Sequence, residues 1–290
     1  MSDSIPPAIM LDKRQARAAF ERAADTYDDS AVLQREIANR MLERLDLIRC
    51  SPQRVLDVGC RTGHCSRALQ KRYKGAVIVG VDLAYGMARA AQTQTHWRTR
   101  QRFVCGDAET LPVADAAVDM IVSNLTLQWC TPDTVFQEFA RVLRPGGVLM
   151  FTSFGPDTLH ELRAAWRAVD ERPHVHTFLD MHDVGDALVR AGFAEPVMDV
   201  EHFTLTYPDV MALLRDLKRL GAHNVDRDRL RGLTGKASFA SFKSAYEAHA
   251  RDGLIPASYE AVYGHAWAAE SRSRVRSARS VSIPLDQLKR

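Results

Sequence analysis

The chain has 290 residues, of which 46% are hydrophobic, and a formal net charge of +3 at pH 7. This size and composition suit one large globular domain, or one domain with a sizeable insertion. No apolar run approaches the roughly 20 residues that a membrane-spanning helix needs. Residues 1–11 also lack the basic start and apolar centre of a secretion signal. We therefore expect a soluble, cytoplasmic protein without a membrane partner.

Basic residues and cysteines are unevenly distributed. Residues 271–290 hold six basic residues against a single acidic one, whereas the rest of the chain is close to neutral. Serines alternate with the arginines there, which favours a solvated, disordered tail over a nucleic-acid-binding arm. The five cysteines are scattered and mostly lie in or beside apolar segments, which is typical of reduced thiols rather than disulfides or a zinc site.

Residues 12–48 are predicted to form helices, because apolar side chains recur there at steps of three and four residues. The polar segment 25–30 interrupts this pattern and separates two amphipathic helices. Tyr27 lies in the break, where its side chain either reaches a pocket or packs at the helix junction. We assign 12–48 to a group of helices that precedes the main domain, residues 49–270.

A strand, a tight turn and a helix are predicted between residues 54 and 73. A largely apolar run reaches Asp57, and Gly59 and Gly63 mark the turn before a helical segment at 64–73. Glycine allows backbone angles that a side chain forbids, and it lets the main chain approach a ligand above the carboxyl end of the strand. Nucleotide-like ligands are commonly held in this way.

Strands and helices then alternate. Continuous apolar strands between helices are typical of a parallel sheet that is covered on both faces, and ligands of such sheets bind beyond the carboxyl ends of the strands. The predicted strands are 76–82, 102–107, 118–124 and 147–152, and the predicted helices are 85–94 and 134–143.

The alternation becomes less regular after residue 152. Two helices between the last two strands form a predicted insertion, at about 208–252, which we expect to cover the pocket. The predicted helices are 157–170, 180–191, 209–220 and 239–250, and the predicted strands are 197–207 and 259–267.

Three predicted strands end in an acid at even intervals, namely Asp57, Asp82 and Asp107. A carboxylate at position 82 can accept both hydroxyls of a ribose, as in dinucleotide enzymes and methyltransferases. The turn lacks the three-glycine pattern that packs a pyrophosphate against a helix start. S-adenosylmethionine has no phosphate, and its cationic groups favour carboxylates; Asp107, next to Ala108, can accept from the adenine amino group. The residues therefore favour S-adenosylmethionine as the ligand.

Four segments in order resemble motifs of class I S-adenosylmethionine-dependent methyltransferases. They are the turn from Asp57 to Gly63 and the segments 81–87, 106–112 and 141–147. Further segments resemble the malonyl-acyl carrier protein methyltransferase family of biotin synthesis, and the resemblance covers about residues 14–270. These segments are 20–28, 123–130, 217–224, 233–235 and 259–267.

The resemblance implies a Rossmann-like α/β fold whose sheet is mostly parallel, with an antiparallel last strand, N-terminal lid helices and a helical insertion between the last two strands. It implies S-adenosylmethionine as the cofactor. The implied methyl acceptor is the free carboxylate of malonyl-acyl carrier protein or malonyl-CoA, whose methyl ester primes pimeloyl synthesis for biotin.

The resemblance also implies which residues surround the cofactor and the acceptor. Tyr27 matches the tyrosine of the N-terminal lid in this family. Asp57, Gly59 and Gly63 are implied for the methionine end, Asp82 for the ribose, Asp107 and Ala108 for the adenine, and Asn124 and Leu125 for the pocket floor near the methyl group; Leu83 is a further cofactor-binding residue.

Methyl transfer to a carboxylate needs no general base, because a carboxylate with a pKa of roughly 4 is already ionised at neutral pH. We therefore predict no catalytic acid or base, and no metal, although His174, His176 and His182 lie close together in the sequence. The malonyl group does need a cationic clamp, for which Arg163 is a candidate; a solvated surface arginine is the alternative. Trp129 is a candidate pocket wall.

An acyl carrier protein is acidic, so basic residues near the insertion form either its docking surface or a solvated charged face. These residues are Lys218, Arg219, Arg227, Arg229, Arg231 and Lys236.

Arg61 stands where this family usually has glycine. It is tolerated if its backbone angles are ordinary and its side chain points to solvent, and otherwise it crowds the cofactor.

Two alternatives to the malonyl-acyl carrier protein methyltransferase function are a methyltransferase for another small carboxylic acid such as trans-aconitate, and a cofactor-binding protein without catalysis. We expect a monomer without a nucleic-acid partner.

Overall fold

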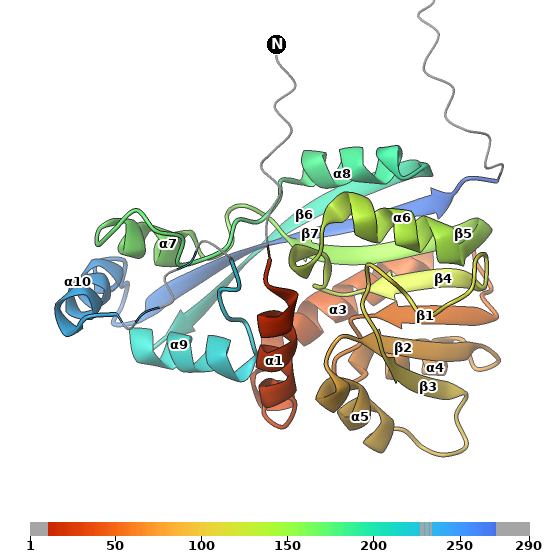
Figure 1. Cartoon of the computed structure of the whole chain (residues 1–290), viewed down its shortest axis with the longest axis horizontal. Helices are drawn as coiled ribbons and strands as arrows, with labels where there is room; N and C mark the ends of the chain where they lie inside the picture. Colours follow the sequence, from red (N-terminus) through yellow and green to blue (C-terminus); the bar gives the residue numbers. More distant parts are fainter. Residues whose placement is uncertain (1–10, 227–228, 230–231, 233, 271–290) are drawn as a thin grey trace, which may run out of the picture.

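The centre of the molecule is a seven-stranded sheet with strand order β3-β2-β1-β4-β5-β7-β6 (Figure 1). The computed structural model describes residues 11–226, 229, 232 and 234–270, so the predicted basic tail and residues 227, 231 and 233 lie outside the described residues. The strands are β1 (Arg54–Val58), β2 (Val77–Asp82), β3 (Gln101–Cys105), β4 (Val118–Ser123), β5 (Leu143–Phe154), β6 (Phe193–Tyr207) and β7 (Ile255–Ala268).

Strand direction confirms the predicted fold class. The strands β1 to β5 pair in parallel, whereas β7 pairs antiparallel with both β5 and β6. All six residues of β4 are buried, which explains why the central strands form continuous apolar runs instead of alternating. The strand β5 begins at Leu143 and therefore starts before the strand predicted at 147–152.

Helices cover both faces of the sheet, and neighbouring residues of β1 pack on opposite sides. Val55 belongs to a core cluster with the helices α3 and α4, whereas Leu56 belongs to a second cluster with α6 and α8. The helices that flank the sheet are α3 (Val32–Arg44), α4 (His64–Arg72), α5 (Tyr85–Thr93), α6 (Pro132–Val142) and α8 (Met181–Arg190).

The N-terminal helices differ in where they pack. The helix α3 buries Ile37 and Met41 completely in the main core, so it is part of the sheet's covering layer. The helix α1 (Lys13–Ala23) and the short α2 (Tyr27–Ser30) lie instead beside the carboxyl ends of the strands. The predicted boundary at residue 48 therefore groups α3, which packs in the main core, with α1 and α2, which lie beside the strand ends.

The predicted insertion contributes α9 (Val210–Arg219) and α10 (Lys236–Glu247), which gather with α7 (His160–Arg167) at one end of the molecule (Figure 1). It also contacts the N-terminal segment. The Asp12 amide donates to the Val225 carbonyl at 2.9 Å, and the Thr26 hydroxyl donates to the Arg219 carbonyl at 3.1 Å. The insertion and α1 thus lie side by side. Among the described residues, no helix is long and apolar enough to cross a membrane.

Candidate cofactor and acceptor site

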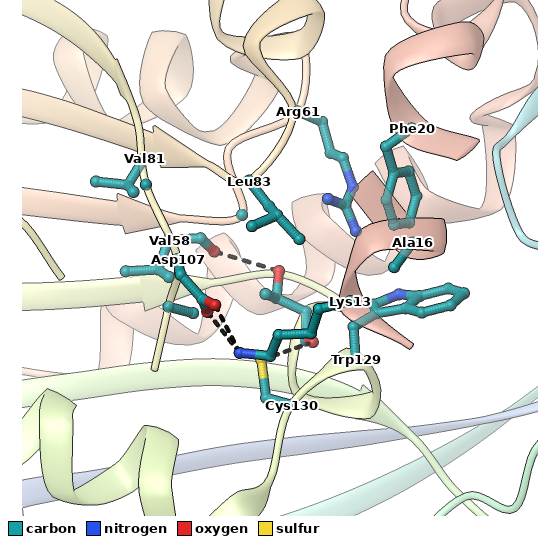
Figure 2. Close-up of a pocket in the computed structure, with 14 residues that line it drawn as sticks. Lys13, Ala16, Phe20, Val58, Arg61, Val81, Leu83, Asp107, Trp129 and Cys130 are labelled. Carbon is teal, nitrogen blue, oxygen red and sulfur yellow. Dashed lines mark hydrogen bonds and ion pairs between the residues drawn. The ribbon is translucent and has the colours of Figure 1, made fainter. Parts of the chain in front are cut away.

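A pocket opens at the carboxyl ends of β1, β2 and β4, and residues of α1 form one of its walls (Figure 2). Leu83, Asp107 and Ala108 line this pocket, as does Trp129 from the short helix η2 (Leu127–Trp129). A second hollow is lined by residues of α2 and α3, the glycine turn and the end of β4. Both include Gly59 and Arg61, so the glycine turn separates them.

The glycine turn requires glycine at position 59. Gly59 has φ of 72°, and a Cβ atom built there would lie 1.9 Å from the Thr126 hydroxyl oxygen. Only a residue without a side chain can therefore pass under the loop that follows β4. Gly63, with φ of 83°, directly precedes α4. This close packing brings the loop after β4 against the turn.

Asp57 lies beneath the turn, at the end of β1, and is almost completely buried. The Ser66 hydroxyl donates to its Oδ2 at 2.5 Å. Burial raises the pKa of Asp57 to about 6, although the Ser66 hydrogen bond acts in the opposite direction. Asp57 is therefore a carboxylate that a cationic ligand group would stabilise in its ionised form.

Asp82 lies at the end of β2, and its carboxylate is occupied from within the protein. Oδ1 accepts from the Ala84 amide at 2.9 Å, and Oδ2 accepts from the Arg61 amide at 2.9 Å and from Arg61 Nη1 at 3.3 Å. The Arg61 guanidinium thus covers the Oδ2 side of the carboxylate. The predicted ribose acceptor is therefore already paired with Arg61.

Arg61 has neither the ordinary backbone angles nor the solvent-facing side chain that would leave the cofactor site open. Its φ is 48°, in the left-handed region, and its side chain points into the pocket rather than to solvent (Figure 2). The guanidinium carbon lies 3.9 Å from the centre of the Phe20 ring, a cation–π contact that holds it between α1 and Asp82. The structure thus places an arginine where a cofactor would cross the turn.

Asp107 is occupied in the same way. Lys13 Nζ lies 2.7 Å from both carboxylate oxygens of Asp107 and 2.6 Å from Glu109 Oε2 (Figure 2). The two acids raise the pKa of Lys13, although its partial burial opposes them. This ion pair links the first turn of α1 to the segment that follows β3, across the predicted adenine position.

The residues predicted near the methyl group are held firmly. Asn124 lines the second hollow; its Oδ1 accepts from the Thr152 hydroxyl at 2.7 Å, and its Nδ2 donates to the Gln34 carbonyl at 3.1 Å. Tyr27 lines the same hollow, and burial raises the pKa of its hydroxyl. Leu125 has its side chain in the main core and lines neither hollow.

Trp129 connects the pocket to a further aromatic group. Its ring lies 5.1 Å from the Phe20 ring and 5.0 Å from the His176 ring, measured between centres. His176 in turn lies 4.6 Å from Phe178, and the guanidinium carbon of Arg163 lies 6.0 Å from the Phe178 ring centre. Arg163 lines neither hollow, but it reaches the same aromatic group as Trp129.

His174, one of the three neighbouring histidines, has its partners within the protein. His174 Nε2 lies 2.8 Å from Asp170, and His174 stacks on Trp166. Within the part of the chain that the structure describes, Asp157, His202 and Glu260 place their ligand atoms within 4.8 Å of one another. Glu260 Oε2 also accepts from the Asp157 amide at 2.8 Å.

Sequence reasoning missed Lys13, Phe20 and His176. Lys13, Ala16 and Phe20 lie on one face of α1, at steps of three and four residues, and all three line the pocket. This spacing was a usable signal for a helix that faces a pocket. No local pattern distinguishes the partner of Lys13, because Asp107 lies 94 residues further along the chain.

Comparison with known proteins agrees with this geometry. A family model described as a methyltransferase domain matches residues 56–151. The YcgJ protein from Bacillus subtilis has a similar structure, with a TM-score of 0.57 and 17% identity over 80% of this chain and 99% of that chain. The [4+2]-cyclase SpnF is also similar, with a TM-score of 0.51 and 24% identity over 81% of each chain. At these identities the likeness concerns the fold alone.

Curated relatives are much more similar in sequence. A malonyl-[acyl-carrier protein] O-methyltransferase from Methylovorus is 50% identical over 91% of this chain and 92% of its own length. Malonyl-[acyl-carrier protein] O-methyltransferase 1 from Coxiella burnetii is 41% identical over 97% of both chains. With this identity along nearly the whole length of each protein, the chain belongs to the malonyl-[acyl-carrier protein] O-methyltransferase family.

Proposed function

We propose that this protein transfers a methyl group from S-adenosylmethionine to the free carboxylate of malonyl-acyl carrier protein. The observation that carries the proposal is the set of three acids, Asp57, Asp82 and Asp107, beyond adjacent strands around one glycine turn, in a chain of this family. A carboxylate oxygen forms the new bond to the methyl carbon while the carbon–sulfur bond breaks. The products are the methyl ester and S-adenosylhomocysteine.

Each of the three acids suits a different part of the cofactor. Asp57 can accept from the ammonium group, Asp82 from the ribose hydroxyls and Asp107 from the adenine amino group. S-adenosylmethionine, when bound, supplies the electrophilic methyl group. Before that, Arg61 and Lys13 have to release Asp82 and Asp107, because their side chains now occupy these acceptors.

The remaining residues position the acceptor and exclude water. Phe20 and Trp129 form an apolar wall beside the cofactor acceptors, and Tyr27 and Asn124 line the neighbouring hollow. Arg163 is our candidate clamp for the malonyl group. Since the nucleophile is already ionised, alignment and exclusion of water replace acid–base chemistry, and alignment can supply about 7–11 kcal/mol.

An acidic carrier protein needs a basic surface. Lys218, Arg219 and Lys236 are exposed and flank the loop between α9 and α10, and Arg229 lies in that loop. We propose this surface for docking, because it adjoins α1 and hence the pocket. A monomeric state and a cytoplasmic location stay predictions.

One incubation tests the proposed function. The purified protein is mixed with labelled S-adenosylmethionine and malonyl-acyl carrier protein, and the carrier protein is analysed by mass for a methyl ester. Measurable cofactor binding without any ester would contradict the enzyme assignment. Ester formation only on free small acids such as trans-aconitate would instead favour a different acceptor.

A further inference from the structure

Two buried nitrogen atoms near the pocket have no hydrogen-bond partner among the described residues. They are Nε2 of His176, a residue that is only 6% exposed, and Nη1 of Arg163. The other terminal nitrogen of Arg163, Nη2, donates to the Pro156 carbonyl. The guanidinium is therefore anchored on one side and unpaired on the other.

Unpaired buried donors are costly, and a buried cation normally has an anionic partner. The nearby acids do not serve this purpose. Both oxygens of Glu161 accept from Ser258, at 3.1 Å from its amide and 2.5 Å from its hydroxyl. Asp157 exposes 70% of its side chain and makes no ion pair with Arg163 in the described part of the chain. Among the described residues, Nη1 of this cation is thus left without an acceptor.

The two donors meet at one aromatic wall. The Phe178 ring lies 4.6 Å from the His176 ring and 6.0 Å from the guanidinium carbon of Arg163. The Trp129 ring, which lines the pocket, lies 5.0 Å from His176 on the other side. Trp129 therefore connects the pocket to His176, and the Phe178 ring connects His176 to Arg163.

The protonation state of His176 suits an anion without requiring a second positive charge. Burial, together with the charge of Arg163, lowers the pKa of His176 to about 4, so the ring is neutral at pH 7. A neutral imidazole carries one N–H group, and in the Nε2–H tautomer it donates a hydrogen bond from the unpaired atom. Arg163 supplies the charge.

We propose that Arg163 and His176 form a carboxylate subsite that recognises the malonyl end of the acceptor. This inference rests on the proposed function. The guanidinium and the imidazole donate to the carboxylate, which keeps a lone pair for attack on the methyl group. Because both nitrogen atoms are covered, the Trp129 or Phe178 ring turns aside when the acceptor enters.

The subsite would select acceptors by charge. A thioester with a neutral end of the same shape offers one ketone oxygen in place of two carboxylate oxygens and no charge to pair with Arg163, and such sites reject the neutral analogue strongly. Acetoacetyl-acyl carrier protein is a suitable neutral analogue, because a methyl ketone replaces the carboxylate. We expect the wild-type protein to bind the malonyl form at least about 10-fold more tightly.

The experiment measures the dissociation constants of both carrier-protein forms with S-adenosylhomocysteine bound, so that no turnover occurs. The variants are Arg163→Met and His176→Phe, which remove the donors, with Arg163→Lys as a variant that keeps the charge. The matched controls are Arg167→Met, an exposed arginine on the same helix, and His182→Phe, an exposed histidine on α8. Cofactor affinity and thermal melting verify that each variant is folded.

The inference predicts that Arg163→Met and His176→Phe lose most of the preference for the malonyl form, that Arg163→Lys keeps part of it, and that both controls keep all of it. Folded Arg163→Met and His176→Phe proteins that keep the full preference would overturn the subsite. If the wild-type protein methylates malonyl-acyl carrier protein at the same time, the proposed function stands and only the subsite is wrong. A wild-type protein that binds cofactor but forms no ester contradicts the proposed function itself.

Discussion

The proposed cofactor site and the proposed acceptor subsite differ in how their polar groups are satisfied. On the cofactor side, the carboxylates have internal donors: Asp57 has Ser66, Asp82 has Arg61 and Asp107 has Lys13. On the acceptor side, Arg163 and His176 each keep a buried nitrogen atom without a partner in the described residues. If the proposed roles hold, cofactor binding exchanges one set of polar contacts for another, whereas acceptor binding adds contacts that the free protein lacks.

This difference has an energetic consequence. Exchanging an internal pair for a ligand contact yields only the difference between two similar interactions, whereas pairing an orphaned buried donor recovers the whole cost of its desolvation. We therefore expect the acceptor side to discriminate more sharply between ligands, and the cofactor side to respond to changes in its internal cations. The following predictions test this comparison, from the largest expected effect to the smallest.

Replacing Asp82 should have the largest effect. Asp82→Ala removes the predicted ribose acceptor and also the acceptor for the Ala84 and Arg61 amides, so we expect at least about a 100-fold loss of cofactor affinity. Calorimetric titration with S-adenosylhomocysteine measures it. Asp46→Ala, at an exposed acid that pairs with Arg72, is the control. Unchanged affinity in a folded Asp82→Ala protein would show that the ribose lies elsewhere.

Acidification should have the second-largest effect, which is a loss of cofactor affinity. Asp57 has a pKa of about 6, and only its ionised form attracts the cofactor's ammonium group. As the pH falls below about 6, we expect affinity to fall by up to about tenfold per pH unit, until the pair itself is lost. Ser66→Ala removes a hydrogen bond that lowers this pKa, so the fall should begin at higher pH in that variant. An affinity that is constant between pH 7 and pH 5 would exclude Asp57 as the ammonium acceptor.

Removing the Arg61 side chain should strengthen cofactor binding. Arg61→Gly frees Oδ2 of Asp82 and suits the left-handed backbone, so we expect affinity to rise by about 10-fold. Arg61→Lys keeps a cation, so its cofactor affinity should lie between that of the wild-type protein and that of Arg61→Gly. Weaker binding by Arg61→Gly would mean that the guanidinium contacts the cofactor instead of competing with it.

Removing Lys13 should have the smallest effect. Its partners at Asp107 and Glu109 are partly exposed, so the ion pair contributes within about 1 kcal/mol and is screened by salt. Lys13→Met should raise cofactor affinity a few-fold at low salt and show little difference at high salt. Arg17→Met, an exposed position on the same helix, should change neither value. If the effect of Lys13→Met on cofactor affinity instead grows with salt concentration, Lys13 does not act as a competing cation at Asp107.

Much of the cofactor side was predictable from sequence. Apolar runs that end in Asp57, Asp82 and Asp107 marked the strands, and the glycine turn marked the place where the chain bends beneath a ligand. These are local patterns, because strand periodicity, burial and turn geometry depend mainly on residues close together in the sequence. Their position at a common edge then follows from the parallel order of the strands.

The sequence by itself determined the fold class, through the family resemblance, together with the turn and the three acids. Only the tertiary structure decided that Arg61 points inward, that Lys13 meets Asp107 and that His176 lies behind Trp129. The reason is that each of these contacts joins segments that are distant in the chain, so it depends on how α1, the loop after β4 and the loop after α7 pack together. Periodicity shows which face of an element is buried, but only packing shows which side chain it meets.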